Sequence, residues 1–366
     1  MNDALQVEIP RRVGPDARVM ARVDGNEVWF ESQDVELSPS CEAFGSAFLI
    51  PALLRGRRLG MAGPVASDWA AHTADIARII HRWWGAPVLL PTFAAGAPVP
   101  RAIARGTVLC FSGGVDSFFT LLRGGERPDW LVFVHGFDVP LTDGQRADWA
   151  REDLEAAAAS VGARPVTIRT GLRSHPAFAC VSWERTHGGA LAAIGHLLSG
   201  VGDRLLVSST LSTDDLHPWG SHVALDHLWA GGGLQIRHVG ADLDRIGKLR
   251  QIADEPLVRS HLRVCWENRD ARRNCSRCEK CVRTRLSLAI LGCLEEFPVF
   301  DGPGTLARDV DGVASVPAWQ LTDRFVYAQV LQAGLPAELR AAVRRLLARS
   351  RRHEWGRRLR QFVRRH

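Results

Sequence analysis

The amino-acid sequence predicts an α/β protein with a doubly wound parallel sheet, and two observations support this fold class. Between residues 107 and 239, short apolar segments alternate with segments of helical character, which indicates parallel strands with helices on both faces of the sheet. The second observation is an apolar run at 108–111 that leads into a polar turn at 112–117 and then into a helix-compatible stretch. Ligands of such sheets bind beyond the carboxyl ends of the strands, so we expect function in the loops that follow strands.

The residues ahead of this core, 1–93, are expected to form an N-terminal α+β extension. Asp24-Gly25-Asn26 joins two strand-like segments, as in a β-hairpin. Serine residues precede two helical stretches and could cap them. The expected elements are strands at 18–23 and 27–31, a helix capped by Ser38 or Ser40 and ending at 54, a helix capped by Ser67 and ending at 84, and a short strand at 87–92.

An Ala-, Gly- and Pro-rich linker at 94–106 is expected to lead into a nucleotide-binding domain at 107–300, and an Arg-rich helical extension at 301–366 follows. The further core elements expected are strands at 131–135, 166–169, 204–208 and 234–239, with helices at 148–161 and 187–198. The C-terminal extension is expected to hold three helices, at 317–333, 336–350 and 354–365.

Charge is unevenly distributed along the 366 residues. The net charge is +6, but residues 340–366 contain eleven Arg and one Glu, a local +10, so the preceding 339 residues carry −4, the difference between the two. Of the 46 basic residues only Lys248 and Lys280 are lysines, which hints that these two positions need an ammonium group. Because we find no run of 18 apolar residues and no leader-like N-terminus, we expect a cytoplasmic protein that does not contact a membrane.

The loop Ser112-Gly113-Gly114-Val115-Asp116-Ser117 is predicted to bind phosphate. Its glycines let a ligand approach the backbone, and N–H groups at the start of the following helix, with the two serine hydroxyls, would hold an anion. Asp116 inside such a site suggests a carboxylate that acts through a divalent cation. A Walker loop is excluded because neither lysine is followed by Ser or Thr, and a dinucleotide fingerprint because three spaced glycines are missing.

Four of the eight cysteines are closely spaced: Cys265, Cys275, Cys278 and Cys281. In a chain without an export signal this spacing is typical of metal ligands rather than of disulfides. Four thiolates can close a tetrahedral zinc site with a structural role, and an iron–sulfur cluster could use the same ligands. The other four, expected to be small core residues, are Cys41, Cys110, Cys180 and Cys293.

The loop resembles the SGGxDS motif of the PP-loop ATP pyrophosphatases, which adenylate a substrate, release pyrophosphate and let a nitrogen or sulfur nucleophile displace AMP. Together with the four cysteines, residues 107 to about 290 resemble 7-cyano-7-deazaguanine synthase-like proteins. The resemblance implies an adenine nucleotide alpha hydrolase-like fold, the cofactors ATP, Mg²⁺ and Zn²⁺, and activation of a carboxylate for attack by ammonia. The long gap between Cys265 and Cys275, and Thr186-His187 after Arg185, depart from the family pattern, so the identity of the acceptor does not carry over.

Individual roles follow from this resemblance. Lys248, at the start of a predicted helix, would neutralise phosphate charge in the transition state, the alternative being a solvated surface lysine. Arg185 would hold a substrate carboxylate, the alternative being an ion pair with Glu184 or another acid. The β- and γ-phosphates of ATP would be bound by Ser112, Gly113, Gly114, Asp116 and Ser117, with Asp116 placing Mg²⁺.

A polar loop after the predicted strand 204–208 is expected to recognise the acceptor. Ser208-Ser209-Thr210 ends that strand, and one of the acidic residues that follow could bind metal or orient the acceptor. Histidines 217, 222 and 227 are expected in a cleft or on the surface rather than in a second metal site. The polar residues of this loop are Asp214, Asp215, His217, Ser221, His222 and Asp226.

We therefore expect an ATP-dependent ligase or synthase that forms a carbon–nitrogen bond on a small-molecule carboxylate. One alternative is a tRNA-thiolating or RNA-ligating relative, because the Arg-rich C-terminus could contact RNA phosphates. Another is a nucleotide-binding module of a multi-protein defence or modification system with a macromolecular acceptor. The sequence leaves the oligomeric state open, a homodimer being one option.

Overall fold

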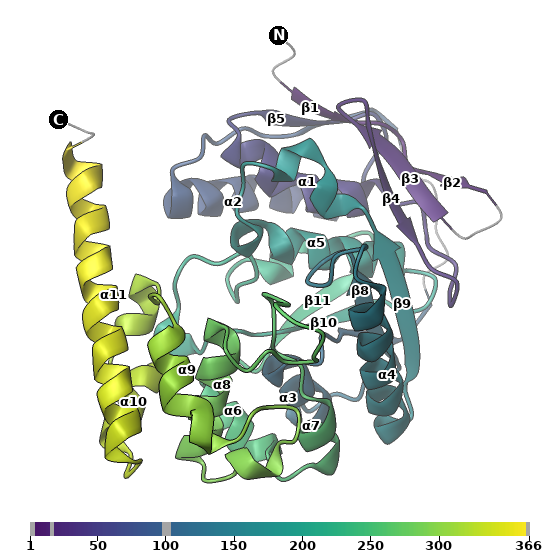
Figure 1. The fold of residues 1–366 in the computed structure, drawn as a ribbon. Coiled ribbons are helices and arrows are strands. Elements are labelled where there is room, and N and C mark those ends of the chain that lie inside the picture. Colours follow the sequence, from purple (N-terminus) through teal and green to yellow (C-terminus); the bar gives the residue numbers. More distant parts are fainter. Residues whose placement is uncertain (1–3, 15–17, 97–103, 364–366) are drawn as a thin grey trace. The chain divides into compact units, whose positions relative to one another are not determined.

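The computed structural model describes residues 4–14, 18–96 and 104–363, and its strands form one mixed sheet (Figure 1). The strands are β1 (Ala4–Val7), β2 (Arg11–Val13), β3 (Arg18–Val23), β4 (Asn26–Glu31), β5 (Arg58–Met61), β6 (Thr92–Phe93), β7 (Thr107–Cys110), β8 (Trp130–His135), β9 (Arg164–Thr170), β10 (Arg204–Ser208) and β11 (Gln235–Val239). The helices are α1 (Cys41–Leu54), α2 (Ser67–Trp84), α3 (Val115–Arg123), α4 (Gly144–Val161), α5 (Trp183–Leu197), α6 (Arg245–Ile252), α7 (Pro256–His261), α8 (Glu279–Ile290), α9 (Leu306–Gly312), α10 (Val326–Gln332) and α11 (Ala337–Val363).

Five parallel strands form the centre of the sheet, in the order β11-β10-β7-β8-β9. The chain enters this sheet at β7, moves outward through β8 to β9, and then crosses back to β10 and β11 on the other side of β7. The direction of winding therefore reverses between β7 and β10. Crevices for ligands form at such a reversal, outside the carboxyl ends of the strands.

Helices cover both faces of these strands, which accounts for their apolar sequences. Successive side chains of a strand point to opposite faces. Val108 and Val132 belong to the same buried cluster as side chains of α1 and α5, whereas their neighbours Leu109 and Leu131 lie outside that cluster and are nevertheless fully buried. Figure 1 shows α5 and α1 beside one another and α4 lying along β8 and β9. The structure is thus α/β, with a mixed, mostly parallel sheet flanked by helices.

Strands of the first 93 residues extend this sheet. β4 pairs antiparallel with β9, with Phe30 opposite Thr170, and β3, β1, β5 and β6 follow in order. The predicted hairpin is confirmed, since β3 and β4 pair from Arg18 opposite Glu31 to Val23 opposite Asn26. α1 also packs on α5, so residues 1–93 belong to the same compact unit as the parallel strands.

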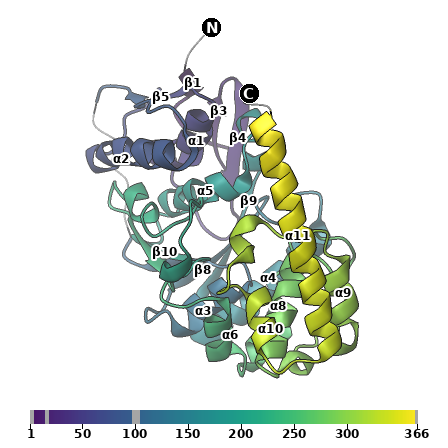
Figure 2. The same ribbon diagram turned by 90° about the vertical axis from the view of Figure 1, so that its left-hand side faces the viewer.

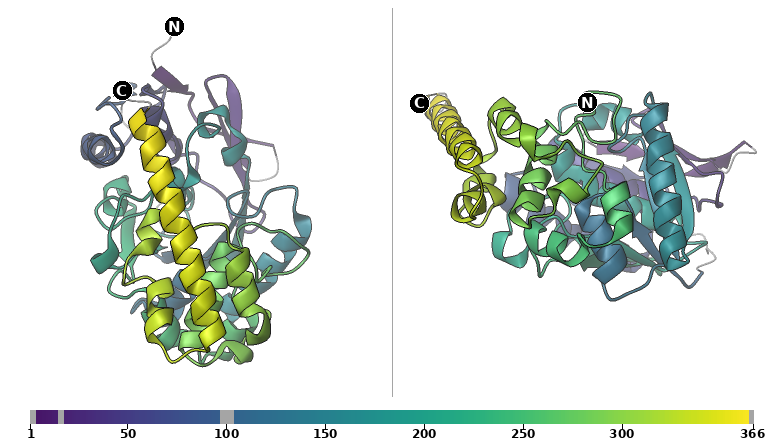
Figure 3. Two further views of the ribbon diagram at one scale, coloured as in Figure 1. Left: turned by 60° about the vertical axis from the view of Figure 1, so that its left-hand side comes forward. Right: turned by 60° about the horizontal axis from the view of Figure 1, so that its bottom comes forward.

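A second compact unit contains residues Gly113–Phe119, Thr213–His217 and the chain from Leu243 onward. Its helices are α6 to α11, together with the start of α3. α8 contacts α6, α9 and α10, and α11 packs along α9 and α10. Figures 2 and 3 show α11 beside these two helices, with its C-terminal part running beyond them. Among the described residues, no helix combines the length and the apolar character needed to span a bilayer.

Two predictions made from short stretches of sequence, one strand and one helix cap, are confirmed. The predicted strand 204–208 matches β10, and Ser40 caps α1 by accepting a hydrogen bond from the Ala43 N–H. Ser67 is instead the first residue of α2, which has no side-chain cap, and residues 87–91 are irregular, with a strand only at β6.

The C-terminal helices differ from the prediction in number and length. The stretch 317–333 contains a short 3₁₀ turn at Ala318–Leu321 and then α10. Residues 337–350 and 354–363 belong to the single helix α11, because no Gly or Pro lies between Ser350 and Glu354 to interrupt it, and Pro336 precedes the helix. The last two residues of the predicted helix 354–365 lie outside the described part of the chain, as do residues 97–103 of the predicted linker.

Candidate functional site

The loop predicted to bind phosphate joins β7 to α3 and depends on glycine at its turn. Gly113 has φ of +72°, a left-handed conformation that side chains with a Cβ rarely adopt. The Gly114 carbonyl accepts hydrogen bonds from the Ser117 hydroxyl and the Phe118 N–H, each at 3.0 Å, which closes the first turn of α3. The Gly113 carbonyl accepts from the Arg263 N–H at 2.8 Å. Ser112 is exposed and Ser117 is buried, so the two hydroxyls predicted to bind phosphate differ in their exposure to solvent.

Asp116, on the first turn of α3, is bound by two cations from α6. Lys248 Nζ donates to Asp116 Oδ1 at 3.1 Å, and Arg245 Nη2 donates to Oδ2 at 3.3 Å. Asp244 caps α6 by accepting from the Gly247 N–H at 2.7 Å, and residues three apart on a helix share a face. The structure therefore brings Asp116 and Lys248, two of the predicted catalytic residues, into direct contact within one unit.

The electrostatic field at Asp116 is dominated by positive charge. Burial alone would raise the pKa of this carboxyl, but Lys248, Arg245 and Lys280 together outweigh it and hold the pKa below the usual value. Lys248 is 1% exposed, so its ammonium group is held out of bulk water beside the carboxylate. The only two lysines of the chain thus both act on the loop carboxylate. Three cations act on Asp116, and Arg283 and Glu279 act in turn on Arg245, so cations outnumber carboxylates around this loop, which suits a polyphosphate.

Sequence reasoning missed Arg245 as part of this group. The signal was its position three residues before Lys248, immediately after the capping residue Asp244. Burial lowers the pKa of Arg245, and the Asp116 carboxylate opposes that shift. Its guanidinium therefore holds the second carboxylate oxygen of Asp116, while Lys248 holds the first.

The four predicted metal-ligating cysteines are brought together, and they are buried. The sulfur atoms of Cys265, Cys275, Cys278 and Cys281 all lie within 4.8 Å of one another, and Cys265 Sγ is 3.9 Å from Cys278 Sγ. Hydrogen bonds with the other three thiols lower the pKa of Cys265 and raise that of Cys281, and those with Cys265 and Cys275 raise the pKa of Cys278, so the thiols ionise as a coupled set. The group could hold a metal ion such as zinc.

The sulfur separations fit a single ion. With Zn–S bonds of about 2.3 Å, the edges of a tetrahedron are about 3.8 Å, close to the separation of Cys265 and Cys278. In a cluster of four irons each thiolate binds a different iron atom, so the four cysteine sulfurs would lie further apart than they do here. In the described ranges, no other group of three or more His, Cys, Asp or Glu side chains could hold a metal ion.

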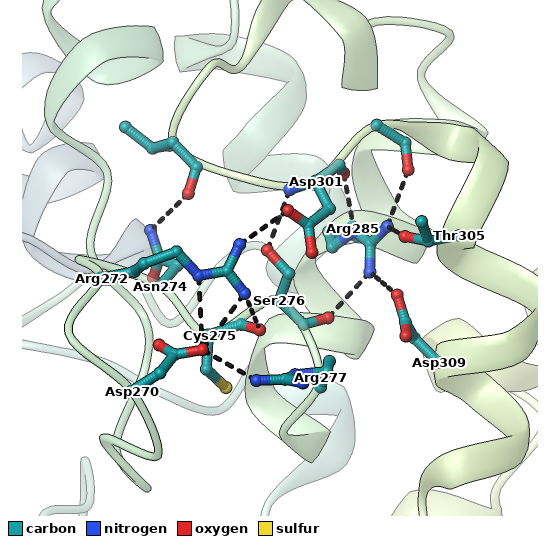
Figure 4. A network of polar contacts seen from close by, with 12 residues as sticks. Asp270, Arg272, Asn274, Cys275, Ser276, Arg277, Arg285, Asp301, Thr305 and Asp309 are labelled. Atoms are coloured by element: carbon teal, nitrogen blue, oxygen red, sulfur yellow. Dashed lines mark hydrogen bonds and ion pairs between the residues drawn. The ribbon is translucent and has the colours of Figure 1, made fainter.

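Hydrogen bonds from the surrounding backbone and side chains fix the cysteine loops (Figure 4). Asn274 accepts from the Val264 and Cys265 N–H groups at 2.8 and 3.1 Å, and its amide donates to the Leu262 carbonyl at 2.8 Å. The Cys278 N–H donates to Cys275 Sγ at 3.2 Å, a contact that stabilises a thiolate ligand.

Arg285 of α8 holds the far side of the same loops. It is fully buried, and its five N–H groups are satisfied in full. The acceptors, which Figure 4 shows around the guanidinium, are the carbonyls of Ser276, Asp301 and Gly302, the Thr305 hydroxyl and the Asp309 carboxylate. A buried arginine with no unsatisfied donor makes this part of the second unit rigid.

Arg185, the predicted carboxylate-binding residue, lies in the first unit, whereas Asp116 and Lys248 lie in the second. It is exposed on the first turn of α5, and its guanidinium lies 5.4 Å from the ring centroid of Trp84. The alternative, an ion pair with Glu184, is not seen among the described residues, where stacking on the indole orients the guanidinium.

The polar loop predicted to recognise the acceptor is divided between the two units. Asp214 pairs with Arg324 at 3.3 Å and His217 stacks on Trp319, both within the second unit. Ser221 and Asp226 belong to the first unit, where the Ser221 hydroxyl donates to Asp226 Oδ2 at 2.7 Å. Asp226 is 1% exposed, so among the acidic residues of this loop it is the one that is buried and hydrogen-bonded to a polar side chain.

Comparisons with known proteins place this chain in no family. No family model matches it, and no curated protein matches it. Among solved structures it is weakly similar to a type III CRISPR defence DNA nuclease activated by cyclic oligoadenylate, with 13% sequence identity and a TM-score of 0.22. That alignment covers 83% of this chain, and the chain spans 55% of the length of the nuclease. A likeness this weak supports no conclusion about fold or function.

Proposed function

We propose that the protein uses ATP to activate a carboxylate, releasing pyrophosphate and forming an acyl adenylate that ammonia or an amine then attacks. The observation that carries this proposal is the group of cations around Asp116, with Lys248 buried among them, at the N-terminus of the helix that follows the central strand β7. Strand β7 lies where the winding of the sheet reverses, the usual place for a nucleotide in such folds. The order of the parallel strands, β11-β10-β7-β8-β9, supports the adenine nucleotide alpha hydrolase-like fold that we infer from the loop motif.

The loop and the two cations of α6 would have different tasks in this reaction. The N–H groups at the start of α3 would bind the β- and γ-phosphates, with Gly113 allowing close approach. Mg²⁺ held by Asp116 would supply Lewis-acid stabilisation of the phosphate oxygens. Lys248 and Arg245 would then exchange part of their contact with Asp116 for contact with the departing pyrophosphate, whose charge grows as the bond to the α-phosphate breaks.

The four cysteines support the same proposal through a structural role. A closed four-thiolate zinc site has no open position for substrate, so it would fix the loops of residues 262–281 without taking part in the chemistry. Those loops include Arg263, whose N–H binds the Gly113 carbonyl. Zinc would therefore stabilise the backbone of the phosphate loop. A 7-cyano-7-deazaguanine synthase-like reaction, with Arg185 on the acceptor carboxylate, is the form of this function that we favour.

Pyrophosphate release tests this proposal directly. The full-length protein is incubated with Mg-ATP and a panel of aromatic and aliphatic carboxylic acids, and pyrophosphate and AMP are measured. We expect acid-dependent release of both products in equal amounts. If ATP binds but no acid supports release of pyrophosphate, the adenylation reaction is contradicted and a nucleotide-binding module of a larger assembly becomes the better account.

A second candidate function, modification of RNA, is favoured by the surface of α11. Trp355 is 70% exposed among arginines of that helix, and Arg side chains with an exposed indole can bind phosphates and stack on a base. Arg345 of the same helix is instead engaged by Asp311, so its guanidinium is less available to a phosphate. The RNA would then be the acceptor of the activated group.

Salt-dependent tRNA binding separates this candidate from the first. The triple variant Arg351→Ala/Arg352→Ala/Trp355→Ala should weaken binding at low salt by ~10-fold or more and reduce the salt slope by about 2, because two phosphate contacts are lost. Arg345→Ala is the matched control and should change little. Wild-type protein with no measurable affinity at low salt would rule out an RNA acceptor.

A further inference from the structure

Helix α10, in the C-terminal extension, has no part in the proposed reaction as described above. It belongs to the second unit, together with the phosphate loop from Gly113 onward and with helices α6 and α8. α10 packs on α8, and α11 packs on α10 in turn (Figure 2). Because these elements lie in one unit, the contacts that α10 makes bear directly on the residues around Asp116.

The first of these contacts joins Gln329 of α10 to the residue that caps α6. Gln329 Nε2 donates to Asp244 Oδ2 at 3.2 Å and to the Arg324 carbonyl at 2.6 Å. An ionised carboxylate and a carbonyl can only accept hydrogen bonds, so the amide nitrogen is the atom that faces both. The other oxygen of Asp244, Oδ1, caps α6 through the Gly247 N–H at 2.7 Å. Gln329 therefore fixes the capping side chain from outside the helix.

The cap of α6 determines where the two cations of that helix lie. Asp244 immediately precedes Arg245, and its carbonyl accepts from the Lys248 N–H at 2.9 Å, which closes the first turn. That turn carries both partners of Asp116, at 3.3 Å for Arg245 and 3.1 Å for Lys248. Loss of a capping interaction frays the first turn of a helix, and α6 has only eight residues. A change at the cap would therefore move both cations.

The second contact joins Tyr327 of α10 to the first residue of α8. Tyr327 is fully buried, and its hydroxyl donates to Glu279 Oε1 at 2.9 Å. Arg283 Nε lies 3.3 Å from the same carboxylate, so Glu279 has two partners that fix its side chain. Glu279 begins α8, and the next residue, Lys280, is the third cation that acts on Asp116. α10 is thus bonded to the start of each helix that supplies a cation to this site.

We propose that α10 is part of the activating site, and that Gln329 and Tyr327 are positioning residues for the cations of α6 and α8. The inference rests on the proposed function. Neither residue is assigned a contact with ATP, and each acts through a carboxylate at a helix start, Asp244 or Glu279. Because one short helix holds both starts, the cations keep their spacing while a polyphosphate takes up part of their contacts. Adenylation therefore depends on a segment that lies far from the phosphate loop in sequence.

Lysine signals test this assignment without any substrate, because Lys248 and Lys280 are the only lysines of the chain. In the full-length protein labelled with ¹³C at the lysine ε position, each gives one signal in an NMR spectrum. Gln329→Leu should shift the Lys248 signal, and Tyr327→Phe should shift the other. Gln332→Leu is the matched control, because Gln332 is exposed on the same helix, and it should shift neither. A variant that leaves its lysine signal unchanged would show that the replaced side chain is not a positioning residue.

A double-mutant cycle separates positioning from a general loss of stability. Gln329→Leu should slow acid-dependent pyrophosphate release by about 10-fold, the effect expected from one lost hydrogen bond to a charged group. In the Lys248→Met background the same change should cost only about 2-fold, because one of the cations that it positions is already gone. Equal losses in both backgrounds would overturn the role of Gln329. If the wild type releases no pyrophosphate with any acid, the proposed function fails, whereas the lysine signals still decide whether α10 positions the two helices.

Discussion

Replacing Lys248 with Met should lower acid-dependent pyrophosphate release by ~10²- to 10³-fold, the usual effect of removing one group that stabilises developing charge. The reason is the location of its ammonium group: Lys248 is 1% exposed, and its Nζ lies 3.1 Å from Asp116 on α3, the helix proposed to bind the triphosphate. Apparent affinity for ATP should fall less than the rate, because the charge on pyrophosphate grows only in the transition state. Pre-steady-state release of labelled pyrophosphate measures both quantities.

The matched control is Arg250→Met, which removes one positive charge from the exposed side of the same helix. That variant should retain its rate within a factor of about two, since surface charges are screened by solvent and salt. Lys248→Met should also cost at most about 3 kcal/mol of stability, because Arg245 still neutralises the partly buried Asp116. Equal rates for Lys248→Met and wild type, in protein that melts cooperatively, would contradict the role of this lysine.

Much of this site could be predicted because its signals are local in sequence. The loop at 112–117 combines strand, glycine turn and helix within ten residues, and the four cysteines lie within seventeen. Lys248 stood out because lysine is almost absent from the chain. None of these inferences needed the topology of the sheet. Compositional bias was informative here because both of the rare lysines lie where their charges act on the Asp116 carboxylate.

What the sequence could not predict depends on contacts between distant segments. The ion pair of Arg245 joins residues 129 positions apart, and the hydrogen bond of Gln329 to Asp244 joins residues 85 positions apart. A glutamine in a helix has no local pattern that separates a solvated residue from one that fixes another helix. The continuity of α11 through residues 350–354 was not predicted, and Gly356 within the helix does not interrupt it either.

Loss of one cysteine ligand should have the largest effect on stability. Cys278→Ser should remove the bound metal and unfold the second unit locally, because metal binding at a closed four-thiolate site contributes directly to folding. We expect the wild-type chain to carry about one metal ion, zinc, measured by plasma mass spectrometry. A purified protein that is colourless and rich in zinc would agree with the sulfur separations, which suit a single ion.

Cys293→Ser separates the effect of the metal from that of a buried thiol. Cys293 is also buried, but its Sγ bonds to the Leu288 carbonyl and lies outside the four-cysteine group. The Cys293→Ser variant should keep its metal and lose only the stability that a single core substitution costs, about 1 kcal/mol. Loss of the metal should also weaken ATP binding, because the Gly113 carbonyl is bound by the N–H of Arg263, two residues before Cys265. Removing the metal from the wild-type protein with a chelator should weaken ATP binding in the same way. A Cys278→Ser protein with bound metal and unchanged melting would show that the four sulfurs are packed together for another reason.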